Sequence, residues 1–161
     1  LKMGKIQIFT GEGRGKTPAA LGEALMAAAL GKQVVIIQFL KGRGLQESLY
    51  QRRLEPEIKL FRFEKSDCDF FALSEEKRKE EIHNIRNGLN FAKKVLTTGE
   101  CDLLVLDEVL ELVGNSIIGE DDLKNVLDAR GEYTDVILTG AQAPEGICGL
   151  ADAISEIHRA K

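Results

Sequence analysis

The amino-acid sequence predicts an α/β fold: a mostly parallel β-sheet with helices on both faces. Short apolar segments suited to strands alternate with longer segments suited to helices, which is the pattern of strands joined by crossover helices. Two of the apolar segments, 33–39 and 102–107, are nearly continuous, as is typical of strands buried on both faces. With 161 residues, the chain is expected to form a single domain over residues 1–161.

Three strands are expected in the first half of the chain: 5–9, 33–39 and 58–63. The Ala- and Leu-rich segment 16–30 predicts a helix between the first two strands, and Gly31 is placed to end it. Between the second and third strands, residues 41–44 predict a loop and residues 46–53 a short helical stretch. Residues 64–73 are expected to be irregular.

The second half of the chain begins with the longest predicted helix. Ser74 is a suitable N-cap, and Gly99 is suited to the helix end. The apolar residues of this segment recur at spacings of three and four, which gives one stripe facing the core: Ile82, Ile85, Leu89, Ala92 and Leu96. One further helix and three strands complete the expected fold: helix 120–129, and strands 102–107, 134–138 and 153–157.

Composition narrows the class of protein. The net charge of −4 argues against nucleic acid as a partner, and the absence of an 18-residue apolar run argues against a membrane span. The three cysteines are far apart and form no metal-binding or disulfide pattern, which fits reduced thiols. The N-terminal residues lead directly into a strand, without a secretory signal. We therefore expect a cytoplasmic protein.

The turn between the first strand and the first helix is rich in glycine and ends in Gly-Lys-Thr. This turn and the residue before it are the candidate nucleotide-binding residues: Thr10, Gly11, Glu12, Gly13, Arg14, Gly15, Lys16 and Thr17. Glycines allow backbone N–H groups to turn inward around an anion, and a helix N-terminus adds partial positive charge. Lys16 is suited to bind the outer phosphates, and the Thr17 hydroxyl is suited to ligate Mg²⁺. The segment therefore predicts binding of a nucleoside triphosphate.

One position departs from the usual phosphate-binding pattern G-x-x-x-x-G-K-[ST]. The first glycine of that pattern is replaced by Thr10, but the alternating glycines that follow keep the turn easy to build. Pro18 falls in the first helical turn, where a missing N–H costs little. Within the turn, we expect Arg14 to pair with phosphate and Glu12 to point outward. The alternative is a flexible loop that binds nothing.

The apolar strand 103–106 is followed by two carboxylates, Asp107 and Glu108, at the sheet edge where the glycine-rich turn is expected. A buried strand that ends in acids beside a phosphate-binding turn indicates a Mg²⁺ site, with Asp107 or Glu108 holding the metal directly or through water. In a hydrolase, Glu108 would instead polarise an attacking water. The alternative is that the two acids cap the helix that follows.

Two smaller segments are expected at the same edge. Residues 38–42 follow the second strand, and residues 139–144 follow the strand 134–138. Their polar side chains are placed to sense a nucleotide or a substrate, and ordinary loop chemistry explains them equally well.

Five segments together resemble the P-loop type of the ATP:corrinoid adenosyltransferase family: 9–17, 38–42, 105–109, 138–140 and 151–156. The resemblance spans nearly the whole chain and implies the P-loop NTPase (RecA-like) fold. It also implies that the cobalt(I) of a reduced corrinoid attacks the 5′ carbon of ATP and that triphosphate leaves. Such corrinoids are cobalamin or cobyrinic acid a,c-diamide. A homodimer and a flavoprotein reductant for the corrinoid are further implications.

The resemblance also implies roles for single residues. Lys16 and Glu108 are the catalytic residues by this reading, because Lys16 offsets the growing charge of the leaving triphosphate. Thr17 and Glu108 would ligate Mg²⁺, and the cobalt nucleophile needs no general base. Residues 66–71 occupy the place of an aromatic segment that packs near the corrinoid in the family.

The chain departs from the family at three places. Residues 66–71 contain two phenylalanines and no tryptophan, so Phe70 or Phe71 is placed to contact a corrinoid, or else belongs to the core. Pro18 stands where a second threonine is usual, and Ala141 where an arginine is usual. Two other functions on the same fold are an ATPase, with Glu108 activating water, and an ATP-binding regulatory module without turnover.

Overall fold

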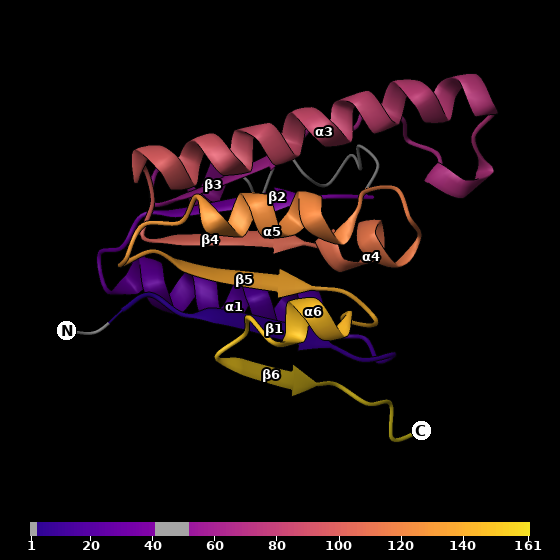
Figure 1. Ribbon diagram of the computed structural model, residues 1–161. Coiled ribbons are helices and arrows are strands. Elements are labelled where there is room, and N and C mark those ends of the chain that lie inside the picture. The colour runs from indigo at the N-terminus through magenta and orange to yellow at the C-terminus, as the bar shows by residue number, and fades with distance from the viewer. Residues whose placement is uncertain (1–2, 41–51) are drawn as a thin grey trace.

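The computed structural model describes residues 3–40 and 52–161, and its centre is a six-stranded β-sheet (Figure 1). The strands are β1 (Ile6–Thr10), β2 (Val34–Gln38), β3 (Ile58–Arg62), β4 (Leu103–Asp107), β5 (Asp135–Thr139) and β6 (Ala153–Glu156). They lie in the order β3-β2-β4-β5-β1-β6, and each neighbouring pair is parallel. The predicted α/β fold with a parallel sheet is therefore confirmed.

Helices cover both faces of the sheet. The described helices are α1 (Lys16–Ala29), α3 (Glu75–Thr98), α4 (Val109–Gly114), α5 (Glu120–Asp128) and α6 (Glu145–Cys148), with a 3₁₀ turn η1 (Phe70–Ala72). Figure 1 shows α1 behind the sheet and α3, α4 and α5 on the opposite side. The buried apolar residues form two corresponding clusters, one beneath α1 and a larger one beneath the other helices.

The alternation of side chains along β2 explains why its sequence is continuously apolar. Val34 and Ile36 belong to the cluster beneath α1, whereas Val35 and Ile37 belong to the cluster beneath α3 and α5. Because successive strand residues point to opposite faces, a strand covered on both sides has no exposed positions for polar residues. Helix α1 fits closely against this face through the small buried residues Ala20 and Ala24.

The ends of the long helix α3 follow the sequence prediction. The Ser74 hydroxyl accepts a hydrogen bond from the Lys77 backbone N–H at 3.4 Å, and Gly99 adopts the left-handed conformation, with φ of 66°. The bounds of the other predicted strands and helices differ from the observed ones by at most one residue at either end. Hydrogen bonding at the ends of elements decides such differences.

The sequence prediction missed the short elements. Helices α4 and α6 and the turn η1 have six, four and three residues, which is too short for a helical repeat of apolar residues to be visible. The predicted irregular segment 64–73 therefore contains one ordered turn. The predicted loop at 41–44 and most of the helical stretch at 46–53 lie outside the described residues, but residues 52–54 are helical.

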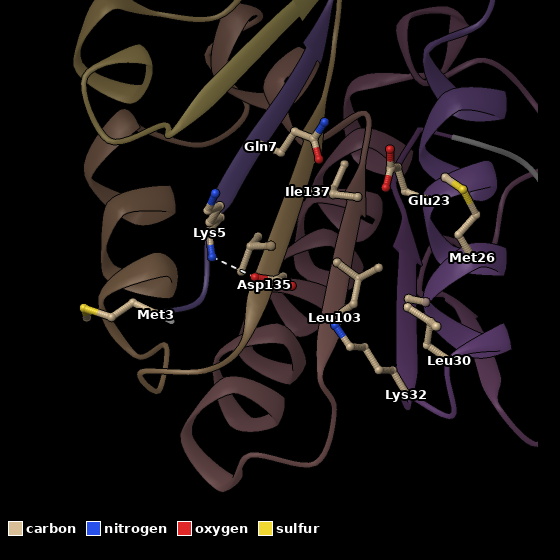
Figure 2. Close-up of a pocket in the computed structure, with 12 residues that line it drawn as sticks. Met3, Lys5, Gln7, Glu23, Met26, Leu30, Lys32, Leu103, Asp135 and Ile137 are labelled. Atoms are coloured by element: carbon tan, nitrogen blue, oxygen red, sulfur yellow. Dashed lines mark hydrogen bonds between the residues drawn. The ribbon is translucent and has the colours of Figure 1, made fainter. Parts of the chain in front are cut away.

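The two edges of the sheet differ in character. A groove of about 350 Å³ lies at the amino ends of β1, β4 and β5 (Figure 2). It is lined by Lys5, Leu103 and Asp135, by Met26 of α1, and by Leu30, which directly follows α1. The glycine-rich turn lies at the opposite edge, beyond the carboxyl ends of the strands. Parallel sheets bind their ligands at that second edge, which is therefore the expected place of the candidate site.

Replacing Leu104 by Ala tests the larger core. Leu104 is fully buried in β4, so its truncation leaves a cavity and is expected to lower the free energy of unfolding by about 2–5 kcal/mol. Leu30→Ala is the matched control, because Leu30 is 77% exposed at the end of α1. Urea denaturation measures both variants. Equal effects at the two positions would contradict the described packing.

Candidate nucleotide-binding site

The glycine-rich turn, residues 11–17, needs glycine at two positions. Gly11 and Gly15 have φ of 114° and 120°, a region that residues with a side chain rarely adopt. A Cβ atom on Gly11 would also lie 2.2 Å from the carbonyl oxygen of Ile157, in the segment that follows β6. Backbone conformation and close packing therefore both explain the glycines that the sequence analysis singled out.

Contacts from two neighbouring segments hold the turn in place. The backbone N–H of Gly11 donates to the carbonyl of Ala141 at 3.0 Å, and that of Gly13 donates to the carbonyl of Ile157 at 3.2 Å. The Thr10 hydroxyl also donates to the Ala141 carbonyl, at 2.8 Å. Thr10 is 6% exposed, so its side chain joins the start of the turn to the segment after β5.

The donors for an anion lie at the start of α1. The Lys16 ammonium donates to the carbonyls of Gly11 at 2.7 Å and Gly13 at 3.1 Å, which holds the charge over the turn. The first intrahelical bond runs from the Ala19 N–H to the carbonyl of Gly15, so α1 begins at the end of the glycine-rich turn. The partial positive charge of a helix N-terminus makes this place suited to bind an anion. An open pocket of about 430 Å³ is lined by residues 12–18 and Glu108.

Asp107, at the end of β4, faces this turn from the centre of the sheet. The carboxylate is 1% exposed. The Thr17 hydroxyl lies 2.9 and 3.1 Å from its two oxygens, and the Thr139 hydroxyl donates to Oδ1 at 2.7 Å. Gln38 Nε2 donates to Oδ2 at 3.2 Å. The structure thus brings together Asp107 and Thr17, two residues that the sequence placed in one metal site.

Glu108 lies in a tight turn immediately after Asp107. Its φ is 63°, and its backbone N–H donates to the Thr139 hydroxyl at 2.7 Å. Glu108 occupies the N-cap position of α4, but its side chain makes no capping hydrogen bond to the described helix. The helix-capping alternative raised from the sequence therefore does not describe its side chain, which lines the pocket beside the turn.

Glu12 and Arg14 are exposed and line the same pocket. The two phenylalanines of segment 66–71 differ from each other. Phe70 is buried in the core, whereas Phe71 is 48% exposed and packs edge-on against it, with ring centroids 5.3 Å apart. Figure 1 shows this turn, just before α3, at the end of the molecule toward which the strand arrows point.

Two charged residues of the site were missed by the sequence analysis. Arg62, the last residue of β3, donates through Nε to Gln38 Oε1 at 2.8 Å. Glu64, two residues later, is 6% exposed and accepts from the Leu40 backbone N–H at 3.0 Å. The available signal was their position, at the last residue of a strand that ends at the ligand-binding edge and two residues after it. No motif includes them.

Burial raises the pKa of Glu64 to about 7. The Leu40 hydrogen bond and the Arg62 charge oppose this shift, while the negative charges of Glu81 and Glu108 add to it. Burial also lowers the pKa of Arg62, against the opposing influence of Asp107 and Glu64. The carboxyl edge of the sheet therefore gathers several charges in a partly dehydrated region.

The donor atoms of this region suit magnesium. Asp107, Glu108 and Thr17 present carboxylate and hydroxyl oxygens, the hard ligands that Mg²⁺ takes from proteins. Among the described residues, no group of three or more His, Cys, Asp or Glu side chains could hold a metal by itself. Mg²⁺ is usually bound through few protein groups together with substrate phosphates, so these residues fit an ion that binds with a triphosphate.

The first strand of the parallel sheet leads through a glycine-rich turn into a helix that begins with Lys16 and Thr17, and Thr17 contacts the buried Asp107. This arrangement defines the class of P-loop nucleotide-binding proteins. The chain belongs to one family within that class. The family model "ATP:corrinoid adenosyltransferase BtuR/CobO/CobP" matches residues 2–161.

Similar proteins agree with this assignment. The chain is 31% identical over 158 residues to the corrinoid adenosyltransferase of Escherichia coli (strain K12). The aligned region covers 98% of this chain and 78% of that protein. The same identity and shares hold for corrinoid adenosyltransferase CobA of Salmonella typhimurium. A crystal structure of a KaiC-like protein from Pyrococcus horikoshii OT3 is similar in fold alone, with a TM-score of 0.61 and 18% identity, covering all of this chain and 76% of that one. In the described parts of this chain, no helix has the length and apolarity to cross a membrane.

Glu64→Gln tests the buried acid. The pKa of Glu64 is raised in the folded state, so the folded protein binds this proton more tightly than the unfolded chain does. The contribution of Glu64 to the free energy of unfolding is therefore fully present below its unfolded pKa of about 4.5 and is lost as the pH rises through about 7. The variant lacks this loss, so the difference in free energy of unfolding between the variant and wild type should shift in favour of the variant as the pH rises from 4.5 to 7, on the order of 2–3 kcal/mol. Urea denaturation at pH 4.5 and 8 measures the difference, and a pH-independent difference would contradict the burial of this charge.

Proposed function

We propose that this chain transfers the 5′-deoxyadenosyl group of ATP to the cobalt of a reduced corrinoid and releases triphosphate. The observation that carries the proposal is the family match across residues 2–161, on a chain whose phosphate-binding turn faces a buried acid. In the step itself, the cobalt(I) electron pair forms a bond to the 5′ carbon. The bond between that carbon and the triphosphate oxygen breaks, and triphosphate leaves with the electron pair.

The residues of the site have matching tasks in this proposal. The N–H groups of Lys16 and Thr17 and the Lys16 ammonium bind the triphosphate and stabilise the charge that grows on it. Thr17, Asp107 and Glu108 hold Mg²⁺ directly or through water, and the ion screens the phosphate charges. Thr10 and the glycines shape the turn. Because the nucleophile is the cobalt of the substrate, no side chain is required as a general base.

The corrinoid is proposed to lie beyond the carboxyl ends of the strands. Phe71 is the exposed member of the aromatic pair in the segment before α3, and an exposed ring at this end of the molecule suits an apolar macrocycle. Phe70 belongs to the core and supports the Phe71 ring. The resemblance further favours a homodimer and a flavoprotein reductant. The three unpaired thiols fit a cytoplasmic location.

Incubation of the protein with ATP, Mg²⁺ and a chemically reduced corrinoid tests the proposed function. Adenosyl transfer gives the spectrum of alkylated cobalt and releases triphosphate only when the reduced corrinoid is present. Release of orthophosphate without a corrinoid would instead identify an ATPase, with Glu108 activating water. ATP binding without either product would identify a regulatory module.

Lys16→Ala is expected to raise the dissociation constant for ATP at least about tenfold, because it removes a full charge from the triphosphate site. Lys32→Ala is the control, since Lys32 lines the groove at the opposite edge of the sheet. Calorimetric titration with ATP and Mg²⁺ measures both variants. Unchanged affinity of Lys16→Ala would refute the assignment of the phosphate site.

Glu108→Gln separates the two roles proposed for this side chain. If Glu108 is a ligand of Mg²⁺, the variant weakens ATP binding in the presence of Mg²⁺ and leaves metal-free binding unchanged. If Glu108 only activates water, ATP binding survives and any hydrolysis disappears. Glu145→Gln, at the exposed start of α6, is the matched control.

A further inference from the structure

Three polar residues from neighbouring strands lie in one row at the carboxyl edge of the sheet. Gln38 of β2 is paired in register with Arg62 of β3 on one side and with Asp107 of β4 on the other. Residues paired in register on parallel strands point to the same face, so their side chains meet. We call Arg62, Gln38 and Asp107 the polar row.

Hydrogen bonds connect the polar row in a fixed direction. Arg62 Nε donates to Gln38 Oε1 at 2.8 Å, and Gln38 Nε2 donates to Asp107 Oδ2 at 3.2 Å. A guanidinium group carries donors only, so its partner on the Gln38 amide must be the oxygen. The amide nitrogen is then directed at Asp107. Arg62 and Asp107 thus favour the same amide orientation from its two sides, and loss of Arg62 removes one of the two contacts that fix it.

The direction of the amide matters because Asp107 in turn holds Thr17. Gln38 is 2% exposed and Asp107 is 1% exposed, so hydrogen bonds between them act in a region of low dielectric constant. The Thr17 hydroxyl lies within 3.1 Å of both Asp107 oxygens. A flipped amide would set the Gln38 oxygen against the carboxylate, and repulsion between the two acceptors would displace Asp107 and with it Thr17.

We propose that Arg62 and Gln38 are positioning residues that orient Asp107, and through it the Thr17 hydroxyl, for binding of Mg²⁺ with a triphosphate. The inference rests on the nucleotide site of the proposed function, and it needs no corrinoid chemistry. Arg62 acts from the neighbouring strand, through the Gln38 amide, on the residue that faces the phosphate-binding turn. Loss of such outer contacts typically weakens metal binding by about 10- to 100-fold.

A double-mutant cycle on ATP binding tests this proposal. The variants are Arg62→Met, Gln38→Leu and the two combined, each titrated calorimetrically with ATP in the presence of Mg²⁺ and in the presence of a chelator. Each single change is expected to weaken Mg²⁺-dependent binding about tenfold and to alter metal-free binding less than about twofold. The combined variant should lose less binding energy than the two single losses added together, because Arg62 acts on Asp107 partly through Gln38.

Two further variants keep the result interpretable. Arg62→Lys retains a donor-only cation and should recover part of the Mg²⁺ dependence of ATP binding. If Arg62→Met does not fold, Arg62→Lys takes its place in the comparison with wild type. Arg86→Met is the matched control, since Arg86 lies on the exposed side of α3 and pairs at 3.9 Å with Asp122. A purely structural role would weaken binding equally with and without Mg²⁺.

Additive effects of the two single variants, or unchanged Mg²⁺ dependence in Arg62→Met, would overturn the proposal. Failure of the proposed function looks different, because wild-type protein would then show no Mg²⁺-dependent ATP binding or no alkylated cobalt. A wild type that binds MgATP and alkylates the corrinoid, with an unaffected Arg62→Met variant, would reject the positioning role alone.

Discussion

The burial of the Asp107 carboxylate is the constraint on which the rest of the site depends. A charge at the centre of a parallel sheet is tolerated only when donors surround it, because the interior solvates it poorly. Here the donors come from three different elements: Thr17 of α1, Gln38 of β2 and Thr139 of β5. The same hydrogen bonds that stabilise the buried charge also fix the helix start that presents Lys16 and Thr17. Satisfying one carboxylate therefore sets the geometry of the phosphate site.

The segments after the other strands complete this arrangement. The Thr139 hydroxyl accepts from the Glu108 N–H and so connects the tight turn at Glu108 to Asp107. Ala141 and Ile157, which follow β5 and β6, accept hydrogen bonds from the glycine-rich turn. The turn thus depends on segments that are about 130 and 145 positions away in the chain, and only the parallel order of the strands brings them together.

Much of this architecture could be predicted from the sequence because it depends on local patterns. Apolar runs, helix periodicity and capping residues such as Ser74 and Gly99 reveal strands and helices. The glycine-rich turn and the acids after β4 reveal the phosphate site, because their chemistry requires those residue types in that order. The short helices α4 and α6 were missed because a few residues show no period. Glu64 was missed because its place after β3 indicates closeness to the ligand-binding edge but not the burial of its carboxyl group.

The sequence alone determined the fold class, the phosphate-binding turn and the family. These features are written in residues that are adjacent or separated by one helical or strand repeat. Only the tertiary structure decided that Thr10 would bind the Ala141 carbonyl and that Arg62, Gln38 and Asp107 would form one row. Those contacts depend on strand order and register. Pairing between strands distant in sequence is set by packing of the whole sheet, which no local pattern encodes.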